Sequence, residues 1–211
     1  MQEHVVQFID YFEGEQQSVI LTEYLEGGEL FQRISSPDYN LTEAKCRDFT
    51  RQILKAVDFI HSRRIIHLDL KPQNIVLCRK PSKAANGSSA QENANLSKEL
   101  KCCDELKIID FGLARALGKF KKNLRNVCVP KFNHFYFSYQ NYLGTPSAGD
   151  MIPINMCGTL EFMSPEVMRC SHASPASDMW SLGVIMYMMV SGGLSPFWGG
   201  NEYKTQRNVL K

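Results

Sequence analysis

The sequence predicts an α+β fold in which a β-hairpin comes first and a mainly helical part follows. Residues 4–12 and 18–25 are β-branched and aromatic and flank a Gly-containing EGEQQ segment, a pattern typical of a hairpin. Residues 42–64 carry apolar side chains at helical spacing. Residues 179–190 form the most apolar run, which is too short to cross a bilayer and therefore predicts a buried helix.

The composition is that of an ordinary globular protein. The chain has 211 residues, of which 44% are hydrophobic and 22% charged, and its formal net charge is +2. A charge this small provides no field that would attract nucleic acid or a membrane, so neither is an expected partner. Seven cysteines without regular spacing predict reduced thiols in a cytoplasmic or nuclear protein. The first ten residues lack the basic and apolar regions of a signal peptide.

The remaining elements follow in order along the chain. The paired glycines of residues 26–34 end the second strand, and a short helix is expected after them. Thr42 is the expected N-cap of the long helix, which carries basic residues at its C-terminal end. Residues 65–78 predict a short strand, a polar turn and another strand, and strand character resumes in residues 105–117.

Two segments lack the pattern of packed elements. Residues 79–104 are rich in Ser, Ala and Asn, and residues 118–155 begin basic and turn aromatic, so both are predicted to be disordered insertions. Two alternatives are less favoured. Cys102 and Cys103 could bind a metal, but no matching Cys/His pair accompanies them. The aromatic residues 132–142 could bind single-stranded nucleic acid, but no charge pattern elsewhere supports it.

The polar turn carries groups suited to phosphoryl transfer. That reaction needs an acceptor to orient a hydroxyl, hard oxygen ligands for Mg²⁺ and a cation for the migrating charge. Asp69 can supply the acceptor and Lys71 the cation. Asn74 and Asp110 offer the oxygen ligands that Mg²⁺ prefers. Gly112 follows Asp110 by two positions and gives the backbone freedom where a loop leaves a strand.

In this order and spacing, the motifs resemble those of Ser/Thr protein kinase catalytic domains. Within that family the chain resembles the calmodulin-dependent kinase group, in particular its myosin light-chain kinase and death-associated kinase branch. The segments that carry the resemblance are HLDLKPQNIVL (67–77), ELKIIDFGLAR (105–115), EYLEGGELFQRI (23–34), MCGTLEFMSPEV (156–167) and SDMWSLGVIMYMMVSGGLSPF (177–197). The resemblance implies a kinase-like fold, with a small-lobe remnant of two strands and a hinge at residues 1–25. Residues 26–211 would form the large lobe, incomplete at its C-terminus.

The resemblance also implies catalytic roles. Asp69 would be the catalytic base and Lys71 would contact the transferred phosphate. Asn74 and Asp110 would bind the metal, with Asp110 as the principal Mg²⁺ ligand. Lys71 together with Thr159 is the family's mark of Ser/Thr rather than Tyr specificity.

Further residues would bind the nucleotide. Thr22 matches the gatekeeper position, and Glu23 to Leu25 match the hinge whose backbone binds adenine. Val76 would form the floor under the adenine ring. Glu29 would contact the ribose and a basic substrate side chain, with a solvated carboxylate at a helix start as the alternative.

Other matching positions are structural. Asp178 would anchor the backbone of the turn from the buried helix, and the alternative is an acidic group at a helix N-terminus. Phe8, His67 and Phe111 would stack as parts of an internal spine.

The chain departs from the family in several places. Leu68 stands where most relatives have an Arg that pairs with a phosphorylated loop, so activation by that route is not expected. No glycine-rich loop or strand lysine precedes His4, and the last large-lobe helices do not follow. Glu166 is therefore expected to be a buried carboxylate without its partner. A retained intron or a faulty gene model would also explain residues 118–155, and a mature transcript that carries them in frame would exclude both.

The function implied by the resemblance is that of an ATP-dependent Ser/Thr protein kinase, which transfers the γ-phosphoryl group of Mg-ATP to a protein hydroxyl. The alternative is a catalytically inactive, kinase-like fragment that acts as a protein-binding module. A protein substrate is the expected partner. The resemblance allows calmodulin as a partner of the full-length relative, but no calmodulin-responsive tail in this chain supports it.

Overall fold

The computed structural model describes residues 3–37, 39, 41–79, 104–117, 152, 154 and 156–211. Almost all of the insertions predicted at 79–104 and 118–155 lie outside these residues. Cys102, Cys103 and residues 132–142 also lie outside them.

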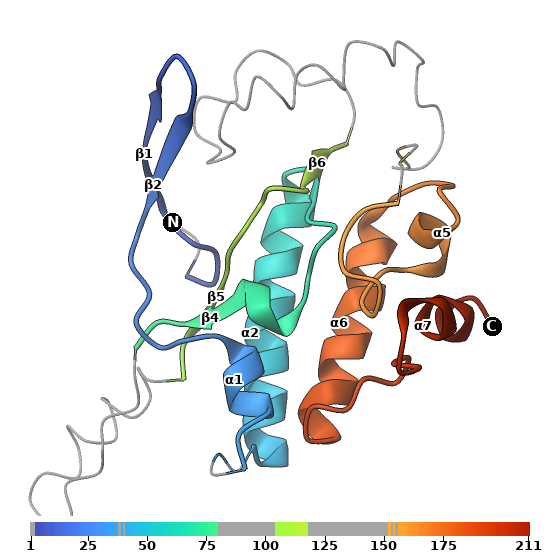
Figure 1. Ribbon diagram of the computed structural model, residues 1–211. Coiled ribbons are helices and arrows are strands. Elements are labelled where there is room, and N and C mark those ends of the chain that lie inside the picture. Colours follow the sequence, from blue (N-terminus) through green and yellow to red (C-terminus); the bar gives the residue numbers. More distant parts are fainter. Residues whose placement is uncertain are drawn as a thin grey trace, which may run out of the picture.

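The described elements alternate short strands with helices (Figure 1). They are β1 (Phe8–Glu13), β2 (Ser18–Thr22), α1 (Leu30–Ile34), α2 (Glu43–Ser62), β3 (Ile65–Ile66), the 3₁₀ turn η1 (Pro72–Asn74), β4 (Ile75–Leu77), β5 (Leu106–Ile108), β6 (Arg115–Ala116), α5 (Pro165–Met168), α6 (Pro175–Val190) and α7 (Glu202–Val209). In Figure 1 the β1–β2 hairpin projects from one end, and α2 and α6 run side by side through the middle. The α+β fold predicted from the sequence is confirmed.

The hairpin forms where the sequence predicts it. β1 and β2 pair antiparallel, with Tyr11 opposite Ile20 and Phe12 opposite Val19. The Gly14 amide donates to the Gln17 carbonyl at 2.9 Å and closes the turn. Phe12 and Val19 are 55% and 50% exposed, so the hairpin buries little apolar surface on this face. Two strands alone are only marginally stable, so the hairpin depends on its attachment to the rest of the molecule.

Helix α2 begins at the predicted cap. Thr42 adopts an extended conformation, and its hydroxyl accepts from the Lys45 amide at 3.4 Å, which satisfies one of the free donors of the first turn. Its apolar stripe, including Phe49 and Ile53, is buried against α6 and β5. This helix supplies one wall of the core.

Helix α6 begins at Pro175, with a reciprocal cap between Ser174 and Ser177. The prediction of a buried helix holds for one face only. Leu182 and Ile185 are buried, but the described residues leave a stripe of the other face exposed. Its members are Met179, Met186, Tyr187 and Val190. The sequence pattern could not show this, because the helix is apolar on nearly all sides.

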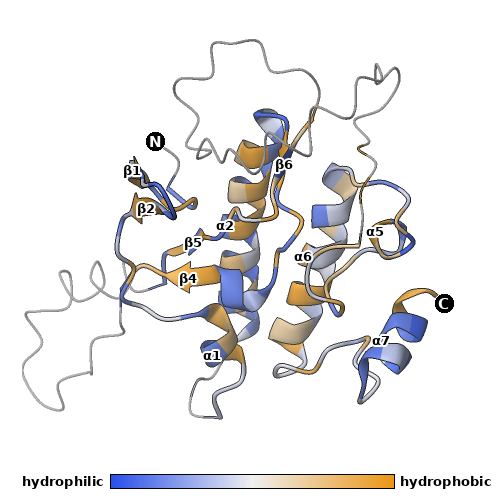
Figure 2. Ribbon diagram, turned by 45° about the horizontal axis from the view of Figure 1, so that its top comes forward, coloured by the Kyte–Doolittle hydropathy of each residue, from blue (hydrophilic) through white to orange (hydrophobic). Residues whose placement is uncertain are grey.

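The short strands connect the helices to the polar turn. β3 pairs antiparallel with β6, and β4 pairs antiparallel with β5, with Ile75 opposite Ile108. Ile75, Leu77 and Ile108 are at most 1% exposed, and Figure 2 shows β4 as a strongly apolar strand. The turn between β3 and β4 is therefore fixed at both ends to the core.

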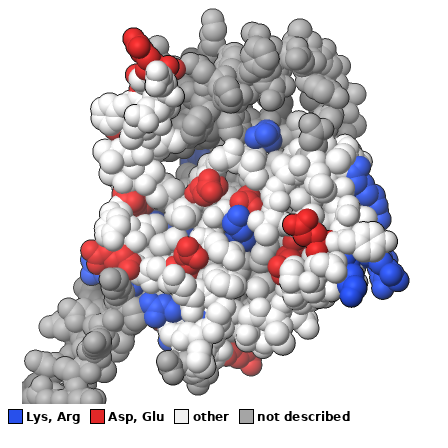
Figure 3. All heavy atoms as spheres, viewed as in Figure 1, with Lys and Arg blue, Asp and Glu red and all other residues white. Residues whose placement is uncertain are grey.

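The described face in Figure 3 carries charged side chains of both signs. Figure 3 shows acidic and basic side chains interspersed over one face, in agreement with the small net charge of +2. In the part of the chain that the structure describes, no helix is both long and apolar enough to cross a membrane.

Candidate active site

The turn between β3 and β4 brings three of the predicted site residues together. The Asp69 carboxylate accepts from the Lys71 ammonium at 2.7 Å and from the Asn74 side-chain amide at 3.1 Å. The Asn74 amide also donates to the Asp69 carbonyl at 2.9 Å. Because the side chains of Lys71 and Asp69 are only 22% and 10% exposed, this charged pair is shielded from solvent.

Thr159 completes the cluster from a distant part of the chain. Its amide and hydroxyl both donate to Asp69 Oδ1 at 3.2 Å, and the hydroxyl accepts from Lys71 Nζ at 3.0 Å. The preceding Gly158 has φ +99°, and a Cβ there would lie 2.8 Å from the Leu68 carbonyl oxygen. Only glycine permits this close approach, so the Gly-Thr pair fixes the orientation of the Asp69 carboxylate.

Asp178 anchors the turn from α6, as the family resemblance implies. Its carboxylate is 1% exposed and accepts from the His67 and Leu68 amides, both at 2.9 Å. The His61 ring lies 2.7 Å from the same carboxylate. Leu68 has φ +67°, a strained conformation for a branched side chain. The two hydrogen bonds from backbone amides to Asp178 hold the backbone in that conformation and thereby position Asp69.

His67 is buried directly behind the turn. Its Nε2 donates to the Ile109 carbonyl at 3.0 Å, so its Nδ1 is free to accept from the Asp69 amide at 3.3 Å. Burial lowers the pKa of His67 and outweighs the opposing effect of Asp178, which keeps the ring neutral. A protonated ring would lose the bond from the Asp69 amide.

The expected stack of three rings is correct for two of them. His67 and Phe111 pack edge to face, with centroids 4.9 Å apart and planes at 61°. Phe8 lies at the start of β1 and makes no ring contact within the described residues. The expectation for Phe8 was wrong, because the resemblance gives its position in the chain but not its packing.

Asp110 lies at the same end of the strands as Asn74. The Ile109 amide donates to the Asn74 carbonyl at 2.9 Å, which extends the β4–β5 pairing by one step. Asp110 has φ +58° and accepts from the Gly112 amide at 3.0 Å. Asn74 uses its side-chain nitrogen toward Asp69, and its Oδ1 has no donor among the described residues. Both residues therefore keep oxygen atoms for another ligand.

The residues expected to bind a nucleotide lie along a second segment. Val76 is 8% exposed, and its backbone bridges that of Glu29. The Thr22 hydroxyl donates to the Glu23 carbonyl at 3.3 Å, and the Leu25 backbone has no hydrogen-bond partner among the described residues. No hydrogen bond or ion pair in the described part of the chain joins these five residues to Asp69.

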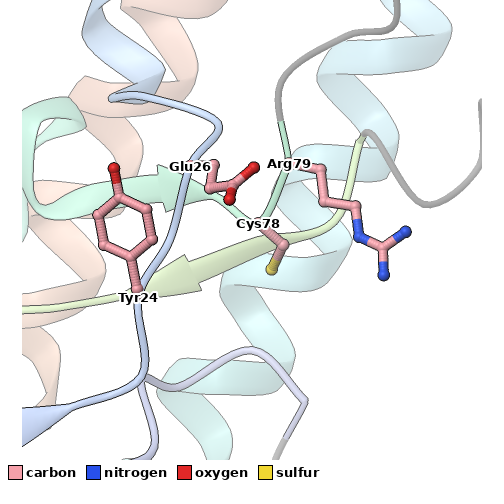
Figure 4. Close-up of a pocket in the computed structure, with 4 residues that line it drawn as sticks. All are labelled: Tyr24, Glu26, Cys78 and Arg79. Atoms are coloured by element: carbon pink, nitrogen blue, oxygen red, sulfur yellow. The ribbon is translucent and has the colours of Figure 1, made fainter.

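A shallow pocket of about 460 Å³ lies beside this segment (Figure 4). Its lining residues are Tyr24, Glu26, Cys78 and Arg79. The pocket is bounded by the end of β4, because the Glu26 amide donates to the Cys78 carbonyl at 3.3 Å. It includes none of the residues of the Asp69 cluster, so the chemistry does not reside there.

The expectation for Glu166 was wrong. Its carboxylate is half-buried and accepts from the Ser177 hydroxyl at 2.8 Å. Burial alone would raise the pKa of Glu166, but the neighbouring hydroxyls of Ser164 and Ser177, its own amide and the charge of His172 lower it. The sequence signal that was missed is the Ser174 to Ser177 cap, which places a hydroxyl at the start of α6.

Comparison with known proteins agrees with this geometry. The family described as "Protein kinase domain" matches residues 1–211. The chain is 37% identical over 207 residues to myosin light chain kinase 3 of Danio rerio, a match that covers 98% of this chain and 22% of that protein. It is 38% identical over 207 residues to myosin light chain kinase 2, skeletal/cardiac muscle, of Oryctolagus cuniculus, covering 98% of this chain and 26% of that protein.

Among solved structures, the twitchin kinase region from C. elegans matches with a TM-score of 0.66 and 30% identity, covering 98% of this chain and 28% of that chain. The chain thus spans about a quarter of the length of these relatives. The matched motifs include the turn that holds Asp69, Lys71 and Asn74. Motifs, fold and comparisons agree that this chain belongs to the protein kinase family.

Proposed function

We propose that this chain is an ATP-dependent Ser/Thr protein kinase that transfers the γ-phosphoryl group of Mg-ATP to a protein hydroxyl. The observation that carries the proposal is the orientation of Asp69. Lys71, Asn74 and Thr159 all bind its carboxylate, and Asp178 fixes the backbone of the two residues before it. Such a preorganised carboxylate can orient an incoming hydroxyl and accept its proton.

Lys71 supports the reaction by its charge. Its ammonium lies 2.7 Å from Asp69 and 3.0 Å from the Thr159 hydroxyl, so it is held beside the proton acceptor. A cation at this point stabilises negative charge on a phosphoryl group during transfer. The contact between Lys71 and Thr159 also agrees with the Ser/Thr specificity that their motifs imply.

Asn74 and Asp110 are suited to hold Mg²⁺. The Asn74 side-chain nitrogen is committed to Asp69, which leaves its oxygen as the group available to a metal. The described residues contain no cluster of three or more His, Cys, Asp or Glu that could hold a metal alone. Mg²⁺ in nucleotide sites needs only one or two such protein ligands, because phosphates and water supply the rest. When bound, the ion neutralises charge on the phosphates.

The segment from Glu23 to Leu25 would bind adenine through its backbone. The Leu25 backbone has no partner among the described residues, so its N–H and C=O are available to a base. Val76 would contact the ring from β4, and Thr22 and Glu29 lie at the two ends of the same segment. The protein substrate is inferred from relatives named myosin light chain kinases, so a myosin light chain is a suitable probe.

The experiment compares the chain with Asp69→Asn and Asp110→Asn variants. Transfer of labelled phosphate from Mg-ATP to a myosin light chain is measured together with the thermal shift in millimolar Mg-ATP. We expect Asp69→Asn to lose about 100- to 10,000-fold in transfer but to keep the thermal shift, because it retains the nucleotide and metal ligands. Asp110→Asn should lose both. The control is Asp48→Asn, at an exposed ion pair with Arg51.

Two results would contradict the proposal. One is a chain that Mg-ATP does not stabilise, which would favour the non-catalytic binding module. The other is an Asp110→Asn variant that transfers phosphate as well as the unmodified chain. A light chain whose phosphate appears on Tyr rather than Ser or Thr would refute the specificity.

A further inference from the structure

A partly buried ion pair joins β5 to the segment that would bind adenine. The Lys107 ammonium lies 2.6 Å from Glu23 Oε1, and the two side chains are 14% and 25% exposed. Lys107 was not singled out by the sequence, because nothing in its pattern distinguishes it from a solvated lysine. The pair links positions 84 residues apart in the chain.

The Glu23 carboxylate also binds the backbone of Gln7, the residue directly before β1. Its Oε1 accepts from the Gln7 amide at 2.7 Å, and the Glu23 amide donates back to the Gln7 carbonyl at 3.0 Å. Glu23 Oε1 thus accepts hydrogen bonds from a backbone N–H and from an ammonium group. Three separate segments meet at Glu23: the residues before β1, the end of β2 and the middle of β5.

The register of the strands explains why Lys107 reaches this point. Lys107 lies opposite Val76 in the β4–β5 pair, whereas its neighbours Leu106 and Ile108 are fully buried. Side chains opposite each other in an antiparallel pair lie on the same face, so Lys107 leaves the sheet on the face of Val76. The β4–β5 pair therefore carries both Val76, the expected floor of the adenine site, and Lys107, which binds Glu23 at the start of the adenine-binding segment.

We propose that Lys107 is a positioning residue for the nucleotide, which acts through the Glu23 carboxylate. The ion pair fixes the backbone from Glu23 to Leu25, in which the free groups of Leu25 would bind adenine, relative to Val76. This inference rests on the proposed function, because it concerns the same nucleotide site. Lys107 itself contacts neither the phosphates nor the acceptor hydroxyl; its effect is to keep the hinge in one orientation.

The inference predicts a specific kinetic change. If Lys107 is replaced by Met, the hinge keeps its sequence but loses its ion pair with β5, and only the backbone bonds of His4 and Val6 to Ile108 remain. ATP must then bind a less ordered backbone. We expect the KM for ATP and the Kd for Mg-ATP to rise by about threefold to tenfold, while kcat changes by less than about twofold. Lys107→Arg keeps the cation and should restore values close to those of the unmodified chain.

A double-mutant cycle tests whether Glu23 is the partner. Glu23→Gln removes the charge but keeps an acceptor for the Gln7 amide, so it tests the ion pair more than the fold. If the two side chains act together, the Lys107→Met, Glu23→Gln double variant should have the same KM as either single variant. Arg47→Met, at an exposed ion pair with Glu43, is the matched control and should leave KM unchanged.

The outcomes separate this inference from the proposed function. Thermal melting without nucleotide first verifies that each variant is folded. The positioning role is overturned if the chain is active and Lys107→Met leaves the KM for ATP unchanged, whatever happens to kcat. That result leaves the proposed function intact. Additive effects in the cycle also overturn it. An unmodified chain that neither binds Mg-ATP nor transfers phosphate refutes the proposed function and the inference with it.

Discussion

The turn between β3 and β4 and the β1–β2 hairpin are held in opposite ways. Around the turn, His67, Leu70 and Ile75 are fully buried, and the turn is bonded to residues from α6 and from the Gly158–Thr159 segment. The hairpin exposes about half of the Phe12 and Val19 side chains. The hairpin joins the rest of the molecule through Glu23, which binds Gln7 and Lys107, and through backbone hydrogen bonds of His4 and Val6 to Ile108 of β5.

This difference separates two requirements of the proposed reaction. An acceptor carboxylate must be held rigidly, because small misplacements greatly slow a transfer. A nucleotide site must admit and release its ligand in every cycle, so part of its wall has to move. The buried bonds around Asp69 suit the first requirement, and the exposed hairpin suits the second. The predictions below test this contrast.

The largest effect is expected at Asp178. Asp178→Ala removes the acceptor of two buried amides and of the His61 ring, so the free energy of unfolding should fall by about 3–5 kcal/mol. Urea unfolding measures the change. The control is Asp48→Ala, whose carboxylate is 62% exposed and should contribute less than about 1 kcal/mol. Equal effects of the two substitutions would show that the turn is not anchored as described.

Gly158 tests the contact between the two distant segments. Gly158→Ala places a Cβ 2.8 Å from the Leu68 carbonyl at φ +99°, so it should cost about 1–3 kcal/mol and move Thr159 away from Asp69. Phosphate transfer should fall with it. In α6, Gly183 has open space around its Cβ position, and Gly183→Ala should instead stabilise the chain by about 0.5–1 kcal/mol. A destabilised Gly183→Ala variant or a neutral Gly158→Ala variant would contradict these assignments.

His67 predicts a dependence of stability on pH. Burial lowers its pKa below the ordinary 6.5, so only the unfolded chain takes up this proton as the pH falls through 6.5. The contribution of His67 to the free energy of unfolding is therefore complete above pH 6.5. Below that pH it falls by about 1.4 kcal/mol per pH unit until the pKa of the folded state is reached.

His67→Phe should flatten this slope, although the variant is less stable overall. The comparison is the difference in unfolding free energy between about pH 7.5 and about pH 5.5, which should be about 1 kcal/mol larger for the unmodified chain. The other histidines are present in both proteins and cancel in the comparison. Equal slopes would show that His67 does not carry the effect.

The smallest effect is expected in the hairpin. Phe12 is 55% exposed, so Phe12→Ser removes little buried surface and should change the free energy of unfolding by less than about 1 kcal/mol. Urea unfolding again measures it. A loss as large as that of Asp178→Ala would mean that the hairpin is packed as firmly as the turn, and the contrast between the two regions would fail.

Local features of this molecule could be predicted from the sequence, and distant contacts could not. The cap at Thr42 and the turn from Asp69 to Asn74 depend on residues close together in the chain, so spacing and residue type were sufficient. The partner of Glu166 and the half-exposed face of α6 depend on which segments meet. Lys107 and Glu23 are an ion pair across 84 positions, and neither residue type nor periodicity identifies such a pair.

The bonds around Asp69 also bear on how the molecule folds. Those from Thr159 and from Asp178 join residues 90 to 111 positions apart. Long chain segments have to be closed before such contacts can form, and proteins dominated by them refold in milliseconds to seconds rather than microseconds. We expect the carboxylate to reach its final orientation late in refolding, after α2 has formed, so that phosphate transfer recovers more slowly than helical circular dichroism.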